Sequence, residues 1–192
     1  MPKLAVVLGS VTPPGRMSAA MRCMVEAPES AKLFEADLLN LAEYRVSFAD
    51  GRPPERYDDD TAQVVSRVAA ADAVLLASPV YRGTFTGALK NLLDHLPVEA
   101  LAGKPVGIVS MGATQHHYLG IDWHLRDVLA WFGALVAPTS VYLASSDFHE
   151  GRPSEAAQAD LVALVTVLAR LREIAPAAGQ WLGPKPLAAR RG

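Results

Sequence analysis

The sequence contains a single cysteine, Cys23, among its 192 residues. One thiol excludes an internal disulfide, and no second cysteine is present to build a cysteine-based metal cluster. Hydrophobic residues make up 51% of the chain and charged residues 20%, which are ordinary values for a globular protein. At this length the chain suits one domain with a full hydrophobic core.

The sequence also lacks a strong excess of charge and any long apolar run. The formal net charge of −2 argues against a nucleic-acid partner, because nucleic-acid binders are usually basic overall or on one face. No apolar stretch reaches the length needed to cross a bilayer, and Met1-Pro2-Lys3 leads directly into an apolar run, with no signal peptide. We therefore expect a cytoplasmic protein that binds neither nucleic acid nor a membrane.

Several catalytic motifs are missing as well. The absence of G-x-G-x-x-G argues against a dinucleotide held in the Rossmann manner. Ser10 is not in a G-x-S-x-G turn, and no His–carboxylate pair stands out to activate it. His116 and His117 are adjacent, but no H-E-x-x-H, carboxylate cluster or second cysteine completes a metal site. We expect no metal, and we interpret these histidines as hydrogen-bond partners of a cofactor or as a subunit contact.

Short apolar runs alternate with segments of helical period. The predicted strands are residues 4–8, 33–39, 73–77 and 106–110, with a fifth inside 135–143. The predicted helices are residues 17–25, 61–71, 85–96, 121–132 and 154–174, with caps expected at Asp60-Thr61 and Ser154. This alternation predicts an α/β fold, a three-layer, doubly wound sandwich. We expect a flavodoxin-like, five-stranded parallel sheet of order 2-1-3-4-5, with a ligand beyond the carboxyl ends of its strands.

The predicted domain covers residues 1–175. From Pro176 the sequence becomes rich in proline, glycine and alanine and ends near Arg190-Arg191. We interpret residues 176–192 as a flexible tail or as an arm that clasps a partner.

The first predicted strand ends at Gly9-Ser10 and is followed, after a short loop, by a predicted helix. Unpaired N–H groups at a helix start carry partial positive charge and attract phosphate. Ser10 and Ser18 offer hydroxyl donors, Arg16 offers a planar charged fork, and Met17 lies between them. The segment is typical of a site for a phosphorylated cofactor, although a plain strand-to-helix connection has similar residues.

The third predicted strand leads into Pro79-Val80-Tyr81-Arg82, a stiff turn before the next helix. Its backbone amides are placed to face a flat polar heterocycle, with Tyr81 lying along it. The alternative interpretation makes Tyr81 an ordinary packing aromatic. After the fourth strand, Gly112-Ala113-Thr114 allows the backbone to approach a ligand closely.

These three loops, in this order, resemble those of the NAD(P)H-dependent FMN reductase family. The longest shared motif runs from Ser78-Pro79-Val80-Tyr81-Arg82 to Lys90-Asn91-Leu92-Leu93-Asp94. The resemblance spans about residues 3 to 145 and is strongest to flavin reductases of two-component monooxygenases such as alkanesulfonate monooxygenase. Relatives often have Lys in place of Arg82 and Gly in place of Ala113.

The resemblance implies roles for residues of all three loops. The implied phosphate ligands of FMN are Ser10, Arg16 and Ser18, with Met17 beside them. The implied neighbours of the ribityl chain and isoalloxazine are Pro79, Val80, Tyr81 and Arg82, and the implied contacts of the ring from the third loop are Gly112, Ala113 and Thr114.

The resemblance also implies an activity and partners. The expected reaction is hydride transfer from NADH or NADPH to FMN, which needs no acid–base residue of the protein. A partner monooxygenase would receive the reduced flavin, and the chain would form a homodimer or homotetramer. Some relatives carry a one-residue insertion that bulges the helix after the third loop, here near Trp123.

Two other functions remain open on the same fold. A quinone or azo-dye reductase would retain its FMN and pass electrons to an organic acceptor. A flavodoxin-type electron carrier would also bind FMN, but such carriers are strongly acidic, and a net charge of −2 weighs against that alternative. A protein that binds phosphate without flavin is a third possibility.

Overall fold

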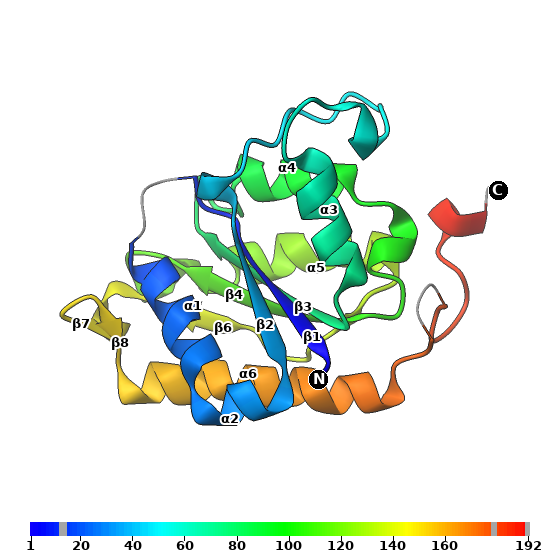
Figure 1. The fold of residues 1–192 in the computed structure, drawn as a ribbon. Helices are drawn as coiled ribbons and strands as arrows, with labels where there is room; N and C mark the ends of the chain where they lie inside the picture. Colours follow the sequence, from blue (N-terminus) through cyan, green and yellow to red (C-terminus); the bar gives the residue numbers. More distant parts are fainter. Residues whose placement is uncertain (12–14, 178–179, 191–192) are drawn as a thin grey trace.

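The central sheet is parallel and has the predicted strand order. The computed structural model describes residues 1–11, 15–177 and 180–190 (Figure 1). Neighbouring strands follow the order β2-β1-β3-β4-β5, and β6 also pairs with β4. The strands are β1 (Lys3–Leu8), β2 (Glu35–Asn40), β3 (Ala73–Pro79), β4 (Pro105–Met111), β5 (Leu135–Val136) and β6 (Val141–Leu143). The flavodoxin-like arrangement expected from the sequence is therefore confirmed.

Helices cover both faces of this sheet (Figure 1). On one face lie α3 (Thr61–Ala70), α4 (Gly87–His95) and α5 (Gly120–Phe132), and on the other lie α1 (Arg16–Glu26), α2 (Pro28–Leu33) and α6 (Glu155–Ile174). The side chains of Ala5 and Val7 in β1 belong to the hydrophobic core between the sheet and helices α3, α4 and α5. Those of Val6 and Leu8 belong to the core on the other face, under α1 and α6. Burial on both faces explains why this strand is a continuous apolar run.

Three differences from the predicted elements have a clear physical cause. Pro28 starts the short helix α2, so the second strand begins at Glu35 rather than at residue 33. Helix α4 begins at Gly87 rather than at residue 85, because the Thr86 side chain caps it. The fifth strand position is divided between β5 and β6, with Pro138, which has no N–H to donate to a ladder, between them.

A small hairpin that the strand pattern did not predict follows the sheet. It consists of β7 (Phe148–His149) and β8 (Arg152–Pro153), which pair antiparallel. Its two-residue turn has positive φ at both positions, 48° at Glu150 and 79° at Gly151. Such backbone matches the twist of a tight hairpin.

The described part of the tail lies against its own domain. Trp181 Nε1 donates a hydrogen bond to the Phe132 carbonyl at 3.3 Å. Gly133, at φ 65°, makes this possible, because a Cβ there would lie 2.5 Å from the Trp181 ring. Residues 178–179 and 191–192 of the predicted tail lie outside the described residues. Within the described chain, no helix is both long and apolar enough to cross a bilayer.

Side-chain hydrogen bonds hold the long connection between β2 and α3, residues 41–60, in place. The carboxylate of Asp59 accepts hydrogen bonds from Ser47 Oγ at 2.6 Å and from the Thr61 N–H at 2.9 Å. Asp60 is the N-cap residue of α3, as expected, but the side chain that accepts from the first turn is that of Asp59. The same connection is also contacted from the end of α4, where His95 Nε2 lies 2.8 Å from the Ser47 carbonyl oxygen.

We expect Asp59→Asn to destabilise the protein by about 1 kcal/mol at pH 7, the scale of a typical single hydrogen bond. Burial alone would raise the pKa of Asp59, but its hydrogen bonds from Ser47 and Thr61 hold it below the ordinary 3.8. The wild-type advantage is therefore full above pH 4 and declines as the pH falls below the ordinary value. Urea unfolding at several pH values measures it, with the exposed Asp58→Asn as a control. Equal stabilities of Asp59→Asn and wild type at pH 7 would contradict this assignment.

Candidate functional site

A buried hydrogen-bond network joins the end of β1 to the end of β3 and the start of α4. The Thr86 hydroxyl donates to the Gly9 carbonyl oxygen and accepts from the Leu89 N–H at 3.1 Å. The Thr86 N–H in turn donates to Ser78 Oγ at 3.1 Å. Thr86 and Ser78 are both buried. We call Gly9, Ser78 and Thr86 the loop junction, because it fixes the first two functional loops relative to each other.

Gly9 is required at this junction for steric reasons. Its N–H donates to the Ala77 carbonyl at 2.7 Å, which keeps the loop close to β3. A Cβ at this position would lie 2.7 Å from the Leu89 Cβ, closer than carbon atoms tolerate. The first loop therefore starts in direct contact with α4.

Among the described residues, no side-chain cap accepts a hydrogen bond from the first N–H groups of helix α1. Its cap residue, Gly15, has no side chain to accept from them, and no acidic residue lies in the first turn. Ser18 is buried in that turn, whereas Arg16 is exposed. A helix start of this kind favours an anion. Thr12, Pro13 and Pro14 of the predicted loop lie outside the described residues.

A cavity of about 240 Å³ opens at this helix start. Its lining includes the predicted residues Ser10, Arg16, Met17, Ser18, Pro79 and Tyr81. It also includes Leu8, Gly15, Asn40 and Met111, which the sequence did not single out. The predicted residues Val80, Arg82, Gly112, Ala113 and Thr114 do not line it. The volume is below the roughly 300–1,000 Å³ of common ligand pockets, so the cavity encloses only part of a nucleotide-sized ligand.

Asn40 is the most informative addition to the site. It is the last residue of β2 and is buried at the carboxyl edge of the sheet. Its Nδ2 donates to Glu43 at 2.8 Å, and its Oδ1 accepts from the Ala42 N–H at 3.3 Å. The only signal in the sequence is a polar residue at the end of an apolar strand beside β1, which is too common to identify a ligand contact.

The second loop forms a rigid turn. Tyr81 N–H donates to the Thr84 carbonyl at 2.8 Å, and Thr84 N–H returns a bond to the Tyr81 carbonyl at 3.1 Å. The two residues between them have positive φ, 51° at Arg82 and 85° at Gly83. Positive φ is unfavourable for a residue with a Cβ, so Arg82 holds a strained conformation, as residues at functional sites often do. Tyr81 remains 45% exposed at the edge of the cavity.

The third loop is tied to its neighbours on both sides. Val80 N–H donates to the Met111 carbonyl at 2.8 Å, and Gly112 N–H donates to the Leu143 carbonyl at 3.0 Å. The Tyr142 hydroxyl crosses over Gly112 to donate to the Thr114 carbonyl. A Cβ on Gly112 would lie only 2.1 Å from that hydroxyl oxygen.

The start of α5 also approaches the second loop closely. A Cβ on Gly120 would lie 2.8 Å from the Gly83 carbonyl oxygen. The helix is α-helical from Gly120 to Phe132, with no π-turn near Trp123. The three predicted loops thus form one continuous surface at the carboxyl edge of the sheet.

The neighbouring histidines lie on the surface after the third loop. His116 and His117 lie on an exposed 3₁₀ turn, and His116 Nδ1 is 3.3 Å from Thr114 Oγ1. Across the ranges that the structure describes, no three His, Cys, Asp or Glu side chains are placed to hold an ion.

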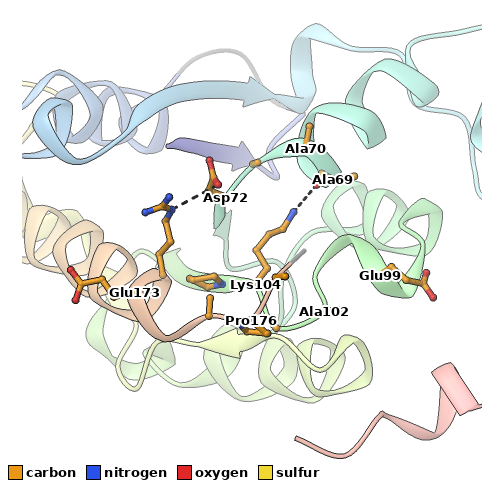
Figure 2. Close-up of a pocket in the computed structure, with 14 residues that line it drawn as sticks. Ala69, Ala70, Asp72, Glu99, Ala102, Lys104, Glu173 and Pro176 are labelled. Carbon is orange, nitrogen blue, oxygen red and sulfur yellow. Dashed lines mark hydrogen bonds and ion pairs between the residues drawn. The ribbon is translucent and has the colours of Figure 1, made fainter. Parts of the chain in front are cut away.

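A larger cavity of about 660 Å³ lies at the opposite edge of the sheet, where β3 and β4 begin (Figure 2). Burial lowers the pKa of Lys104 to about 8, and its Nζ donates to the Ala69 carbonyl at 2.7 Å, at the end of α3. Asp72 lies 3.8 Å from Arg172, and Glu99 and Glu173 lie on opposite sides of the cavity (Figure 2). The cationic side chains of this cavity, Lys104 and Arg172, already have partners in the protein. Ligands of open α/β sheets bind at the carboxyl edge, so we do not assign this cavity a function.

Comparison with known proteins decides the family. Residues 2–149 match the profile of the NADPH-dependent FMN reductases. The chain belongs to this family. An NAD(P)H-dependent FAD/FMN reductase of Geobacillus thermodenitrificans is 40% identical over 127 residues, which are 66% of this chain and 69% of the relative. The NADH-dependent FMN reductase SfnF of Pseudomonas putida is 30% identical over 158 residues, 81% of this chain and 84% of the relative.

The solved structures agree on the fold. FerB of Paracoccus denitrificans, a flavoenzyme NAD(P)H:(acceptor) oxidoreductase, superimposes with a TM-score of 0.72 at 19% identity. The match covers 91% of this chain and 99% of that structure. Membership of the family confirms the predicted enzyme class, an NAD(P)H-dependent FMN oxidoreductase, and the predicted cofactors, FMN and NAD(P)H.

We expect Gly112→Ala to destabilise the protein by about 1–3 kcal/mol, because the new methyl group displaces the Tyr142 hydroxyl. In a Tyr142→Phe background the clashing oxygen is gone, so the same substitution should cost much less. Thermal and urea unfolding of the four variants in this cycle measures the coupling.

Gly87→Ala is the matched control, because a Cβ at Gly87 meets nothing within 4 Å and the residue lies in the first turn of α4. It should leave stability unchanged or slightly raised. An equal cost of Gly112→Ala with and without the Tyr142 hydroxyl would contradict the close approach described here.

Proposed function

We propose that this protein binds FMN at the carboxyl edge of the sheet, in the cavity at the start of α1, and reduces it with a nicotinamide nucleotide. When bound, FMN accepts a hydride at N5 of its ring and carries the two electrons onward. The observation that carries the proposal is the cavity at the start of α1, which gathers Ser10, Arg16 and Ser18 with Pro79 and Tyr81 of the second loop.

The inner end of the cavity suits a terminal phosphate. Arg16 supplies a charged fork, Ser10 and Ser18 supply hydroxyl groups, and the start of α1 supplies N–H donors. Met17 is buried and gives the cavity an apolar wall. Asn40 adds an amide at the end of β2. A dianion placed here meets complementary charge without an acidic residue in the first helical turn to repel it.

The outer surface suits a flat ring. A cavity of about 240 Å³ holds the phosphate and part of the ribityl chain, so the isoalloxazine must extend beyond it. We assign the ring to the surface formed by Val80 to Arg82 on one side and residues 112–114 on the other. Both segments are fixed by backbone hydrogen bonds, which lets the protein orient the ring without rearrangement.

The protein's own residues orient the reactants and do not transfer a proton. Arg82 and Tyr81 are exposed beside the proposed ring position, where a nicotinamide nucleotide can reach one ring face. The hydrogen bonds between Tyr81 and Thr84 hold this turn in place despite the strained backbone at Arg82, and the Arg82 side chain is available for the nucleotide phosphates.

We further propose that reduced FMN is released to a partner monooxygenase. A shallow site that leaves the ring on an open surface suits a flavin that comes and goes. The similarity to the Sfn reductase and the motifs of the three loops support this assignment. The competing function is a quinone or azo-dye reductase that keeps its FMN.

An absorbance assay separates these functions. The purified protein is mixed with NADH or NADPH at a series of FMN concentrations. A rate that saturates with free FMN supports the diffusible flavin. Retention of FMN through gel filtration with fast quinone turnover would assign the competing function, and no oxidation of either nicotinamide would reject both.

We expect Arg16→Ala to weaken FMN binding by about 1–3 kcal/mol, the scale of a hydrogen bond between charged groups. Riboflavin, which lacks the phosphate, should bind wild type and variant equally. Flavin fluorescence titration measures both affinities. Arg22→Ala, at an exposed position in the middle of α1, is the control and should bind FMN as wild type does. Unchanged FMN affinity in a folded Arg16→Ala variant would reject the phosphate role.

We also propose a homodimer or homotetramer formed through α5. Leu119, Trp123 and Trp131 are all exposed on or beside this helix, at 45%, 69% and 61%. A groove of about 460 Å³ between α4 and α5 adjoins Trp131. Its walls include the apolar residues Leu93 and Val128 and the charged residues Lys90, Asp94 and Asp127. Patches of this kind on a globular domain usually mark an interface.

Trp123→Asp should therefore shift the mass measured by light scattering toward the monomer, because it places a charge in the interface. Ile174→Asp is the control, since Ile174 is exposed at the end of α6, away from this surface. A wild-type protein that is monomeric at micromolar concentration would contradict the assembly.

A further inference from the structure

The hairpin β7–β8 contacts Arg16, the residue that we propose as a phosphate ligand. The Arg16 guanidinium carbon lies 5.5 Å from the centre of the Phe148 ring, over its face. Phe148 is half-buried and packs against the core beneath α1 and α6, whereas Arg16 is exposed. Among the described residues, the structure places the Arg16 side chain against this ring.

The hairpin is a fixed element and not a loose loop. The carboxylate of Asp147 accepts from the Ala144 N–H at 2.7 Å, and the Asp147 carbonyl accepts from the Ser154 N–H at 2.8 Å. Ser154 Oγ caps α6 by accepting from the Ala157 N–H at 3.2 Å. β8 packs against α1, and Figure 1 shows the hairpin beside the start of that helix. Phe148 therefore stands at a defined place relative to Arg16.

The geometry points to Phe148 as a positioning residue that holds Arg16 ready for a phosphate. A guanidinium over an aromatic face is attracted by the ring and keeps its N–H donors, because those donors lie in its own plane. The contact removes rotational freedom from a long exposed side chain before the ligand arrives, so less entropy is lost on binding. This inference rests on the proposed binding of the FMN phosphate at Arg16.

The contribution of the Phe148 ring to binding affinity should be specific to ligands that carry a phosphate. An exposed cation–π contact has an energy that corresponds to about a 2- to 5-fold change in affinity. Phe148→Leu keeps an apolar side chain of similar bulk but removes the ring, so it should weaken FMN binding by this factor. Riboflavin binding should not change, because riboflavin has no group for Arg16 to bind. Phe148→Tyr keeps the ring and should bind FMN as wild type does.

The test combines flavin titrations with a double-mutant cycle. FMN and riboflavin affinities are measured for wild type, Phe148→Leu, Phe148→Tyr, Arg16→Ala and the double variant Arg16→Ala/Phe148→Leu. In the Arg16→Ala background, loss of the ring should have no further effect on FMN. His149→Ala, at an exposed neighbouring position on the opposite face of the hairpin, is the control and should leave both affinities unchanged.

The outcomes separate this inference from the function on which it rests. If Phe148→Leu weakens FMN and riboflavin equally, or weakens FMN as much without Arg16 as with it, Phe148 has only a structural role. If wild type binds FMN tightly and Phe148→Leu binds it equally well, the positioning role is wrong while the phosphate site stands. If wild type binds FMN no better than riboflavin, the phosphate site itself is wrong and the positioning role fails with it.

Discussion

The hydroxyl group of Thr86 joins parts of the chain that are far apart in sequence. It donates to the Gly9 carbonyl at the end of β1 and accepts from the Leu89 N–H in the first turn of α4. Because the Thr86 N–H also reaches Ser78, the ends of β1 and β3 and the start of α4 share one buried and satisfied network. A buried polar network of this kind costs free energy unless every member is paired, so its members constrain one another closely. The positions of the first and second loops follow from this constraint.

Close backbone approaches extend the same constraint to the third loop. Gly9 lies against Leu89, Gly112 lies under the Tyr142 hydroxyl, and Gly120 lies against the Gly83 carbonyl. In each case a methyl group would force the neighbour to move. At this edge of the sheet, each of these glycines places its backbone directly against a neighbouring backbone or side chain. These contacts leave the loops little freedom to shift. A surface that is rigid before its ligand arrives loses less entropy on binding.

The parts of this fold that could be predicted from the sequence are those with continuous local patterns. The first, third and fourth strands are largely apolar runs because both of their faces are buried. Their alternation with helices predicts a doubly wound sheet, whereas the strand order was expected from the flavodoxin-like fold and is set less firmly by the sequence. The fifth strand was predicted as one segment, but Pro138 divides it into β5 and β6. The hairpin β7–β8 was not predicted, since its strands have two residues each and no periodicity. Asn40 and Phe148 were missed for a related reason: the importance of each lies in a contact with a distant residue, which a local pattern does not encode.

The central claim is that the carboxyl edge of the sheet holds FMN with its phosphate at the start of α1 and its ring between the second and third loops. A crystal structure of the complex with FMN tests this claim most directly. The account predicts phosphate oxygens within hydrogen-bond distance of Arg16, Ser10 or Ser18, and a ring lying against the turn at Tyr81 and against residues 112–114. A flavin bound elsewhere, or one whose phosphate points away from α1, would contradict it.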